Sequence, residues 1–544
     1  MKGNFDGFPA MVREAINVQR AAPILVLLLI SGSVTSQTVV RDSPAKYDYY
    51  TLTPEPSPKP RINGAKVFGV RPGNPILFTV PATGTRPMTF KAKLLPKGLK
   101  LDERSGRISG SITTPGTYTT TIYATNESGS AEREFRIIVG DKLALTPPMG
   151  WNSWNGWGDF VTAENVRAAA DAMVRTGLIN HGWAYVNIDI GWEGKRGGKY
   201  NAIQPNEKFP DMRGLSEYVH SLGLKMGIYS TPWVRTYFGY TGGSSDNEDG
   251  YLEEMKIDKD NNEGHYVGKY KFDRNEVQQF VEWGIDYLKF DWTSPVDEPD
   301  VVDHCRAMSQ TLKSCGRDIV FSLCHLVSID DARGELPFVQ LWRTTPDIRD
   351  VWDNSMLSKD LWAQGITDIW DAHREWREFT EPGCWADPDM LAVGWVGFGD
   401  KELHYTRLTP DEQYTHVSLW CLWSAPLFIG SPVERLDTFT LALLSNDEVL
   451  EIDQDPLGRQ AHLAERNGDA EVWVKRMEDG SKAVGLFNRS PKEITVSAHW
   501  MYLGVYGKHR VRDVWRQKDL GTFERSFAAK VPSHGVVLVR IFPD

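Results

Sequence analysis

Lys289 and Asp291 stand two positions apart in the apolar run Tyr-Leu-Lys-Phe-Asp-Trp (287–292), which predicts a buried strand. Side chains two positions apart on a strand project to the same face, so the ammonium and the carboxylate are expected side by side. A buried charged pair is costly unless it is used, and two uses are open. It could be an ion pair that only supports the strand end, or a catalytic carboxylate whose charge is held by an ammonium group.

More polar residues end other apolar runs in the middle of the chain. Asp189 ends Val-Asn-Ile-Asp, and Tyr229 ends Met-Gly-Ile-Tyr. Arg343 ends Leu-Trp-Arg shortly before Asp347, and Asp389 follows Cys-Trp-Ala-Asp-Pro. Any one aspartate could cap a helix or form a turn, but capping does not readily explain polar residues at five strand ends.

These apolar runs alternate with helical patterns from 142 to 457, which predicts a (β/α)₈ TIM barrel and an α/β fold class. All the C-terminal strand ends of such a barrel open onto one face, so residues far apart in sequence would meet in a single cleft. The helical patterns cover residues 163–175, 215–222, 274–283 and 301–314.

Strand-like segments flank the predicted barrel on both sides. Short β-branched and aromatic runs between Gly, Pro and Asn turns predict an immunoglobulin-like β-sandwich at 63–140. Strand texture returns after the barrel and predicts a C-terminal antiparallel β-sandwich at 460–544. The stretch 37–62, rich in Pro, Ser and charge, is interpreted as a linker.

Residues 1–36 are interpreted as a secretory signal peptide, which predicts a secreted or periplasmic protein. Arg13 and Arg20 precede the apolar run 21–30, and small residues lead to Ser36. Met11 is an alternative start. The run is short for a membrane span, so no stable membrane anchor is expected, and a signal anchor is the weaker alternative.

The composition excludes several classes of partner. The formal net charge of −11 is spread along 544 residues without a basic stripe, which argues against nucleic acid. The five cysteines show no CxxC and no paired metal spacing, so no metal site is expected. Twenty tryptophans suit the C–H faces of sugar rings, although surplus tryptophan is at least as often core packing.

A cleft with carboxylates, aromatic rings and one arginine, but without metal ligands, points to glycoside hydrolysis. That reaction needs two carboxyl groups, one that attacks or guides water and one that protonates the leaving oxygen. Lys289 would help to keep Asp291 ionised, as a nucleophile requires. Asp347, flanked by proline and isoleucine, is the candidate acid, provided that Arg343 turns away from it.

Leu-Thr-Pro-Pro-Met-Gly-Trp-Asn-Ser-Trp at 145–154 and Gln-Asp-Pro-Leu-Gly at 454–458 bound a region that resembles the family 27 glycoside hydrolases, the α-galactosidase family. The resemblance implies an exo-acting, retaining hydrolase of terminal α-D-galactosyl residues that needs no cofactor. It implies Asp291 as the nucleophile and Asp347 as the general acid/base. It also implies that these residues bind the sugar or line its pocket: Trp154, Asp189, Tyr229, Lys289, Arg343, Asp389 and Met390.

Position 190 departs from the family pattern, because galactose-specific members usually carry a second aspartate there. Ile190 cannot accept a hydrogen bond from the sugar, and an unpaired buried hydroxyl costs about 1–3 kcal/mol. An apolar side chain would suit β-L-arabinopyranose, which is α-D-galactopyranose without the hydroxymethyl arm. Two interpretations stay open: a β-L-arabinopyranosidase, or an α-galactosidase in which another residue supplies the missing acceptor.

Two further positions differ from the family pattern. Many members carry glutamate and tryptophan after Ser-Leu-Cys, whereas His325 follows Cys324 here, and both are candidate substrate-binding residues. His325 would contact the 2-hydroxyl side of the sugar or lie satisfied beneath a loop. Trp-Thr at 292–293 replaces the cysteine that commonly follows the nucleophile, so the family's active-site disulfide is absent. Without that disulfide, the loop 236–246, which is rich in Gly, Ser and Tyr, could be a mobile lid. A carbohydrate-binding protein without catalysis is the alternative from another class.

Overall fold

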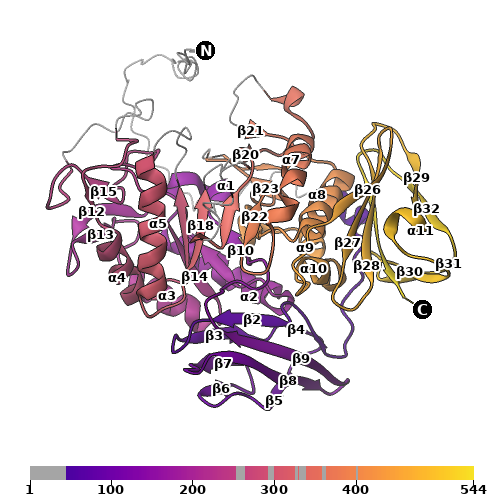
Figure 1. Ribbon diagram of the computed structural model, residues 1–544, viewed down its shortest axis with the longest axis horizontal. Helices are drawn as coiled ribbons and strands as arrows, with labels where there is room; N and C mark the ends of the chain where they lie inside the picture. Colours follow the sequence, from indigo (N-terminus) through magenta and orange to yellow (C-terminus); the bar gives the residue numbers. More distant parts are fainter. Residues whose placement is uncertain are drawn as a thin grey trace, which may run out of the picture.

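The structure, a computed structural model, has three parts (Figure 1). An N-terminal β-sandwich lies below a barrel, and a C-terminal β-sandwich lies beside it. The predicted signal peptide lies outside the described residues. Within the described ranges, no helix has the length and apolar character needed to cross a membrane. The structure describes residues 45–543 except 253–263, 292–298, 325–328, 330–331, 333–337, 358–362 and 400–401.

The N-terminal part is an immunoglobulin-like sandwich, as predicted. Its strands are β1 (Arg61–Ile62), β2 (Val67–Val70), β3 (Ile76–Thr79), β4 (Ala82–Thr83), β5 (Thr89–Lys93), β6 (Leu99–Leu101), β7 (Arg107–Gly110), β8 (Gly116–Asn126) and β9 (Gly129–Val139). One sheet has the order β2-β9-β8-β5, the other β3-β7-β6, and β1 pairs with β4. In β8 and β9 alternate residues such as Ile122 and Ile137 are buried, because one face of the sheet covers the core.

The middle part is a barrel of eight parallel strands, which confirms the predicted fold. The strands are β10 (Met149–Asn152), β11 (Tyr185–Asn187), β14 (Lys225–Ser230), β17 (Tyr287–Asp291), β18 (Val320–Cys324), β19 (Leu341–Arg343), β22 (Trp385–Asp387) and β25 (Leu427–Ile429). They follow one another in chain order, β25 pairs with β10, and a bridge between Leu391 and Ile429 completes the ring. β17 is buried along most of its length, because both faces of a parallel barrel strand are covered.

Helices surround the barrel close to the predicted positions. They are α1 (Trp154–Trp157), α2 (Ala163–Arg175), α3 (Met212–Ser221), α4 (Asp273–Trp283), α5 (Pro299–Ser314), α7 (Ile366–His373), α8 (Pro410–Trp423), α9 (Thr438–Leu444) and α10 (Asp447–Asp453). Thr162 caps α2 and Asn165 bonds back to it, which fixes the predicted start. α3 begins before its predicted apolar pattern, because Asp211 caps it by accepting from Gly214 N at 2.8 Å.

Short strand pairs decorate the barrel loops: β12 (Glu193–Gly197) with β13 (Ala202–Pro205), β15 (Ser244–Ser245) with β16 (Tyr270–Lys271), β20 (Asp347–Ile348) with β21 (Ala363–Gln364), and β23 (Trp395–Val396) with β24 (His404–Tyr405). The described part of the stretch interpreted as a linker lies against the barrel. Tyr47 stacks on Tyr405 with ring centroids 5.4 Å apart, and Leu52 N donates to Tyr414 Oη of α8 at 2.9 Å.

The C-terminal part is an antiparallel sandwich, as predicted. It consists of β26 (His462–Asn467), β27 (Ala470–Arg476), β28 (Lys482–Asn488), β29 (Ile494–His499), α11 (Trp500–Leu503), β30 (His509–Asp513), β31 (Lys518–Phe523), β32 (Ser526–Val531) and β33 (Val536–Phe542). A six-stranded sheet, β26-β27-β28-β33-β30-β31, packs against the pair β29-β32. α8 is buried on all sides because it lies between this sandwich and the barrel.

Candidate active site

The carboxyl ends of the barrel strands carry the polar side chains, as the barrel topology predicts. The predicted residues occupy seven successive strand ends: Trp154 after β10, Asp189 after β11, Tyr229 in β14, Lys289 and Asp291 in β17, Cys324 in β18, Arg343 in β19 and Asp389 after β22. Hydrogen bonds and ion pairs join most of them across the barrel mouth.

Asp291 is buried at the end of β17 and accepts a hydrogen bond from Tyr229, with 3.1 Å between Oη and Oδ2. The pKa of Asp291 is raised to about 6, mainly by burial and also by the charges of Asp189 and Asp347, although Lys289 lowers it. The carboxyl group is therefore mainly ionised at neutral pH. The electrostatic influence of Asp347 also means that these two carboxyl groups lie near each other.

The ammonium of Lys289 bonds to Asp189, on another strand, and its effect on Asp291 acts through space. Lys289 Nζ lies 2.8 Å from Asp189 Oδ2, and Asn152 Nδ2 donates to the same oxygen at 2.9 Å. Asp189 N in turn donates to Ser153 Oγ at 2.9 Å. Lys289 and Asp291, which the sequence places side by side on one strand, therefore do not pair with each other. Lys289 pairs with Asp189, and Asp291 bonds to Tyr229.

The guanidinium group of Arg343 lies between two carboxylates. Nη2 is 3.0 Å from Asp389 Oδ2 and 3.2 Å from Asp347 Oδ1, and it also donates to Thr345 O. The Arg343 side chain is 6% exposed and that of Asp347 is 35% exposed. Because Arg343 turns toward Asp347, the apolar setting predicted for this carboxyl group is wrong.

Asp389 has a left-handed backbone conformation, with φ of 86°, which is uncommon for a residue other than glycine. Its Oδ1 accepts from Met390 N and its Oδ2 from Ile348 N, both at 2.8 Å. The carboxylate therefore connects β20, which carries Asp347, to the end of β22. Strained backbone of this kind gathers at functional sites, where the surroundings hold it.

Comparison with known proteins decides the family. Residues 146–253 and 254–455 match the family model described as "Alpha galactosidase A". The chain belongs to the α-galactosidase family. Residues 467–541 match the "Alpha galactosidase C-terminal beta sandwich domain", and residues 59–140 match a "Putative Ig domain". The predicted family and glycosidase chemistry are confirmed: the chain is a glycoside hydrolase of the α-galactosidase type.

Relatives of the family cover most of the chain. Alpha-galactosidase 2 of Arabidopsis thaliana is 34% identical over 408 residues, which span 73% of this chain and 90% of that protein. A putative alpha-galactosidase of Bacteroides fragilis is 31% identical with a TM-score of 0.78, covering 89% of this chain and 98% of that one. A β-L-arabinopyranosidase of Geobacillus stearothermophilus is 27% identical with a TM-score of 0.61, covering 74% and 97%.

Ile190 and Met390, which the structure describes, lie next to Asp189 and Asp389 at the same strand ends. Ile190 is 3% exposed and Met390 is 7% exposed. Cys324 is a free thiol whose Sγ accepts from Arg343 Nη1 at 3.5 Å, and burial raises the pKa of the thiol well above its usual value. His325 lies outside the described residues.

The loop 236–246, predicted as a possible lid, contacts the loops that follow other strands. Its Phe238 packs edge-to-face on Trp154, with ring centroids 5.3 Å apart. Its Tyr240 donates to Asp159 Oδ2 at 3.2 Å, and Lys208 Nζ lies 3.3 Å from Tyr240 Oη. These contacts hold the loop beside Trp154.

Sequence reasoning missed three polar residues of this region and assigned no role to a fourth, Asp387. Asn152 and Ser153, which bond to Asp189, stand inside the quoted Trp-Asn-Ser-Trp motif, and that position could have indicated them. Asp387 accepts from Asp389 N at 2.9 Å, and burial raises the pKa of Asp387 to about 6. Glu193 carries no sequence signal at all.

Glu193, the first residue of β12, holds its carboxyl group inside the loop that carries Asp189. The residue is 2% exposed, and its Oε2 accepts from Gly191 N at 2.8 Å. Among the described residues, Oε1 has no hydrogen-bond partner. Burial raises the pKa of Glu193 to about 8; the charge of Asp189 raises it too, and Lys208 lowers it.

We expect Glu193→Gln to gain stability relative to the wild type as the pH rises from 5 to 8. Below the usual pKa of 4.5, the folded and unfolded states both hold the proton. Between 4.5 and 8 only the unfolded state releases it, so wild-type stability falls by up to about 1.4 kcal/mol per pH unit. Melting temperatures measured across this range test the prediction. Glu217→Gln, at an exposed position, is the control and should follow the wild type at every pH. If the difference in melting temperature between Glu193→Gln and the wild type does not change with pH, the prediction is wrong.

Proposed function

We propose that this enzyme releases terminal α-D-galactosyl residues from oligosaccharides or polysaccharides with retention of configuration. Asp291 attacks the anomeric carbon while Asp347 protonates the leaving oxygen, and Asp347 then takes a proton from the water that releases the sugar. The observation that carries the proposal is the buried carboxyl group of Asp291, held by Tyr229 and close enough to Asp347 for their charges to interact.

The electrostatics of the cluster support this exchange of roles. The negative charges of Asp291 and Asp347 repel each other, and this repulsion raises the pKa of Asp291. Once Asp291 carries the sugar, its negative charge is gone and that repulsion ends, with the guanidinium Nη2 of Arg343 3.2 Å from Asp347 Oδ1. Asp347 would thus act first as an acid and then as a base.

The proposed sugar-binding residues surround Asp291 at the neighbouring strand ends. Asp189 is held by Lys289 and Asn152, so its carboxylate is fixed in place for the sugar hydroxyls. The full set that we propose to bind or enclose the sugar is Trp154, Asp189, Ile190, Tyr229, Lys289, Cys324, His325, Arg343, Asp389 and Met390.

A second candidate substrate is a β-L-arabinopyranoside, and Ile190 favours it. This side chain is buried next to Asp189, where galactose-specific members of the family usually have an acceptor for the sugar hydroxyls. One similar solved structure is that of a β-L-arabinopyranosidase. β-L-Arabinopyranose lacks the hydroxymethyl arm of galactose, and therefore lacks the hydroxyl group for which isoleucine offers no acceptor.

Wild type and Ile190→Asp, assayed on nitrophenyl α-galactoside and nitrophenyl β-L-arabinopyranoside, test the proposed specificity. We expect the wild type to hydrolyse the galactoside and Ile190→Asp to favour it further, by about tenfold to a hundredfold in the ratio of kcat/KM values. The aspartate supplies the acceptor that isoleucine lacks. Ile190→Val is the matched control and should leave the ratio nearly unchanged. If Ile190→Asp also leaves the ratio unchanged, position 190 does not select the substrate. If the wild type hydrolyses only the arabinopyranoside, the second candidate function is supported.

We also propose that the protein is exported through its N-terminal segment, with cleavage near Ser36. The support is the order of Arg20, the apolar run 21–30 and the small residues before Gln37.

A further inference from the structure

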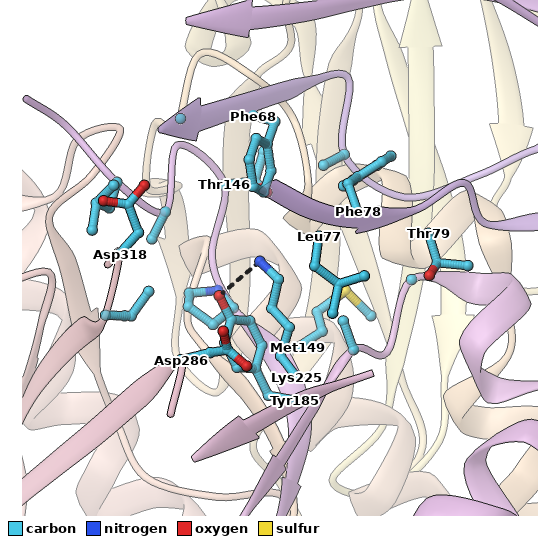
Figure 2. Close-up of a pocket in the computed structure, with 18 of the residues that line it drawn as sticks. Phe68, Leu77, Phe78, Thr79, Thr146, Met149, Tyr185, Lys225, Asp286 and Asp318 are labelled. Atoms are coloured by element: carbon cyan, nitrogen blue, oxygen red, sulfur yellow. Dashed lines mark hydrogen bonds between the residues drawn. The ribbon is translucent and has the colours of Figure 1, made fainter. Parts of the chain in front are cut away.

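A cavity of about 260 Å³ lies between the N-terminal sandwich and the amino ends of the barrel strands (Figure 2). β2 and β3 line it from the sandwich, and β11 and β14 begin beside it with Tyr185 and Lys225. The carboxyl ends of these barrel strands carry the proposed catalytic residues. This interdomain cavity therefore lies at the opposite end of the barrel from the active site.

The wall of the interdomain cavity is largely apolar. Phe68, Leu77 and Phe78 of the sandwich face Met149 of the barrel across it (Figure 2). Small-molecule sites generally combine such walls with a few polar groups, and they often lie between domains.

One polar group in the interdomain cavity is the ammonium of Lys225. Its Nζ lies 4.8 Å from the ring centroid of Phe68, 5.1 Å from that of Tyr185, and 3.5 Å from Tyr185 Oη (Figure 2). An ammonium group has three N–H donors, and this contact uses one of them. The other two are available to a ligand that enters beside the rings.

The charges around the interdomain cavity leave Lys225 without a partner of opposite sign. Asp286 pairs with Arg317, and Asp318 pairs with Arg71 at 3.3 Å. Across the described parts of the chain, no carboxylate forms an ion pair with Lys225. His220 Nε2 also lies 2.7 Å from Asp286 Oδ2. Both carboxylates thus already have partners, and the positive charge of Lys225 remains uncompensated.

We propose that the interdomain cavity binds a small organic monoanion, with its carboxylate on Lys225 and its apolar body against Phe68 and Leu77. The uncompensated positive charge fits a ligand with a single negative charge, and the apolar wall fits a hydrocarbon or aromatic body. Because such a ligand touches the sandwich and the barrel together, its binding also stabilises their contact.

Calorimetric titration of the full chain with benzoate tests this proposal, with galactose present to saturate the catalytic site. We expect one benzoate per chain and a higher melting temperature when benzoate is bound. Benzamide, which has nearly the same shape but no charge, should bind at least about tenfold more weakly. Lys225→Met should weaken benzoate binding by a similar factor while glycosidase activity stays unchanged.

Lys91→Met, which removes an exposed lysine of β5 in the same sandwich, is the matched control and should bind benzoate like the wild type. Equal binding of benzoate and benzamide would overturn the proposal, as would undiminished binding by Lys225→Met. Absence of benzoate binding, or displacement of benzoate by galactose, would overturn it as well. The comparison with benzamide uses the wild type, so it remains decisive even if Lys225→Met folds poorly.

Discussion

Replacing Asp291 with alanine is expected to lower kcat/KM for nitrophenyl α-galactoside on the order of 10⁴-fold or more. The substitution removes the group that we propose attacks the sugar, and Tyr229, its hydrogen-bond partner, cannot take over. Burial raises the pKa of Tyr229 well above its usual value, so the phenol stays protonated and is a poor nucleophile. The melting temperature should stay close to that of the wild type, because the variant is expected to fold normally.

Azide distinguishes a lost nucleophile from a distorted site in Asp291→Ala. The alanine leaves room for a small anion on the face from which Asp291 attacks, so azide should restore turnover and form the β-galactosyl azide. Asp303→Ala, which removes a carboxylate that is 66% exposed on α5, is the control and should retain full activity. Near-normal turnover by Asp291→Ala would refute the assignment of the nucleophile.

The strand ends and helices could be predicted because their signals are local. Apolar runs with polar ends mark the barrel strands, and the barrel topology brings those ends onto one face. α2 begins at its predicted residue because Thr162 provides the cap at the point where the apolar pattern starts. α3 differs because the cap at Asp211 precedes the first apolar residue of the pattern.

The partner of Lys289 could not be predicted because it depends on the stagger of the barrel. Gly227 of β14 pairs with Asn187 of β11, and Tyr229 pairs with Lys289 of β17. Asp189, two residues after Asn187, therefore lies level with Lys289, and inward side chains of alternate strands meet inside a barrel. The two-residue spacing shows that Lys289 and Asp291 share a face of β17. It carries no information about β11, which lies beyond β14 and carries the partner of Lys289.

The setting of Asp347 depends on a turn that its chain neighbours do not describe. Residues 344–346 fold back so that Arg343 reaches the carboxylate, although proline and isoleucine flank Asp347 in sequence. Glu193 was missed for a related reason. Only the fold of the loop after β11 shows that its carboxyl group is buried against Gly191 N.

Asp347→Ala is expected to impair hydrolysis in a way that depends on the leaving group. A sugar alkoxide leaves only when it is protonated, so kcat/KM for the disaccharide melibiose should fall by roughly 10²–10⁴-fold. Nitrophenolate is a stable anion and leaves without that proton, so kcat/KM for nitrophenyl α-galactoside should fall far less. The ratio of the two losses isolates proton donation from substrate binding, because both substrates place the same galactosyl group in the pocket.

The second chemical step provides an independent readout for Asp347→Ala. Without its general base, the variant should release sugar slowly from the galactosyl enzyme, which gives a burst of nitrophenol followed by a slow steady state. Azide needs no base to attack, so it should speed the steady state and form the α-galactosyl azide. This is the opposite anomer to the one expected from Asp291→Ala, because here azide displaces Asp291 from the covalent intermediate. Equal losses on melibiose and the nitrophenyl substrate, without a burst, would show that Asp347 only binds substrate, and the general acid/base would then have to be another carboxyl group of the barrel mouth.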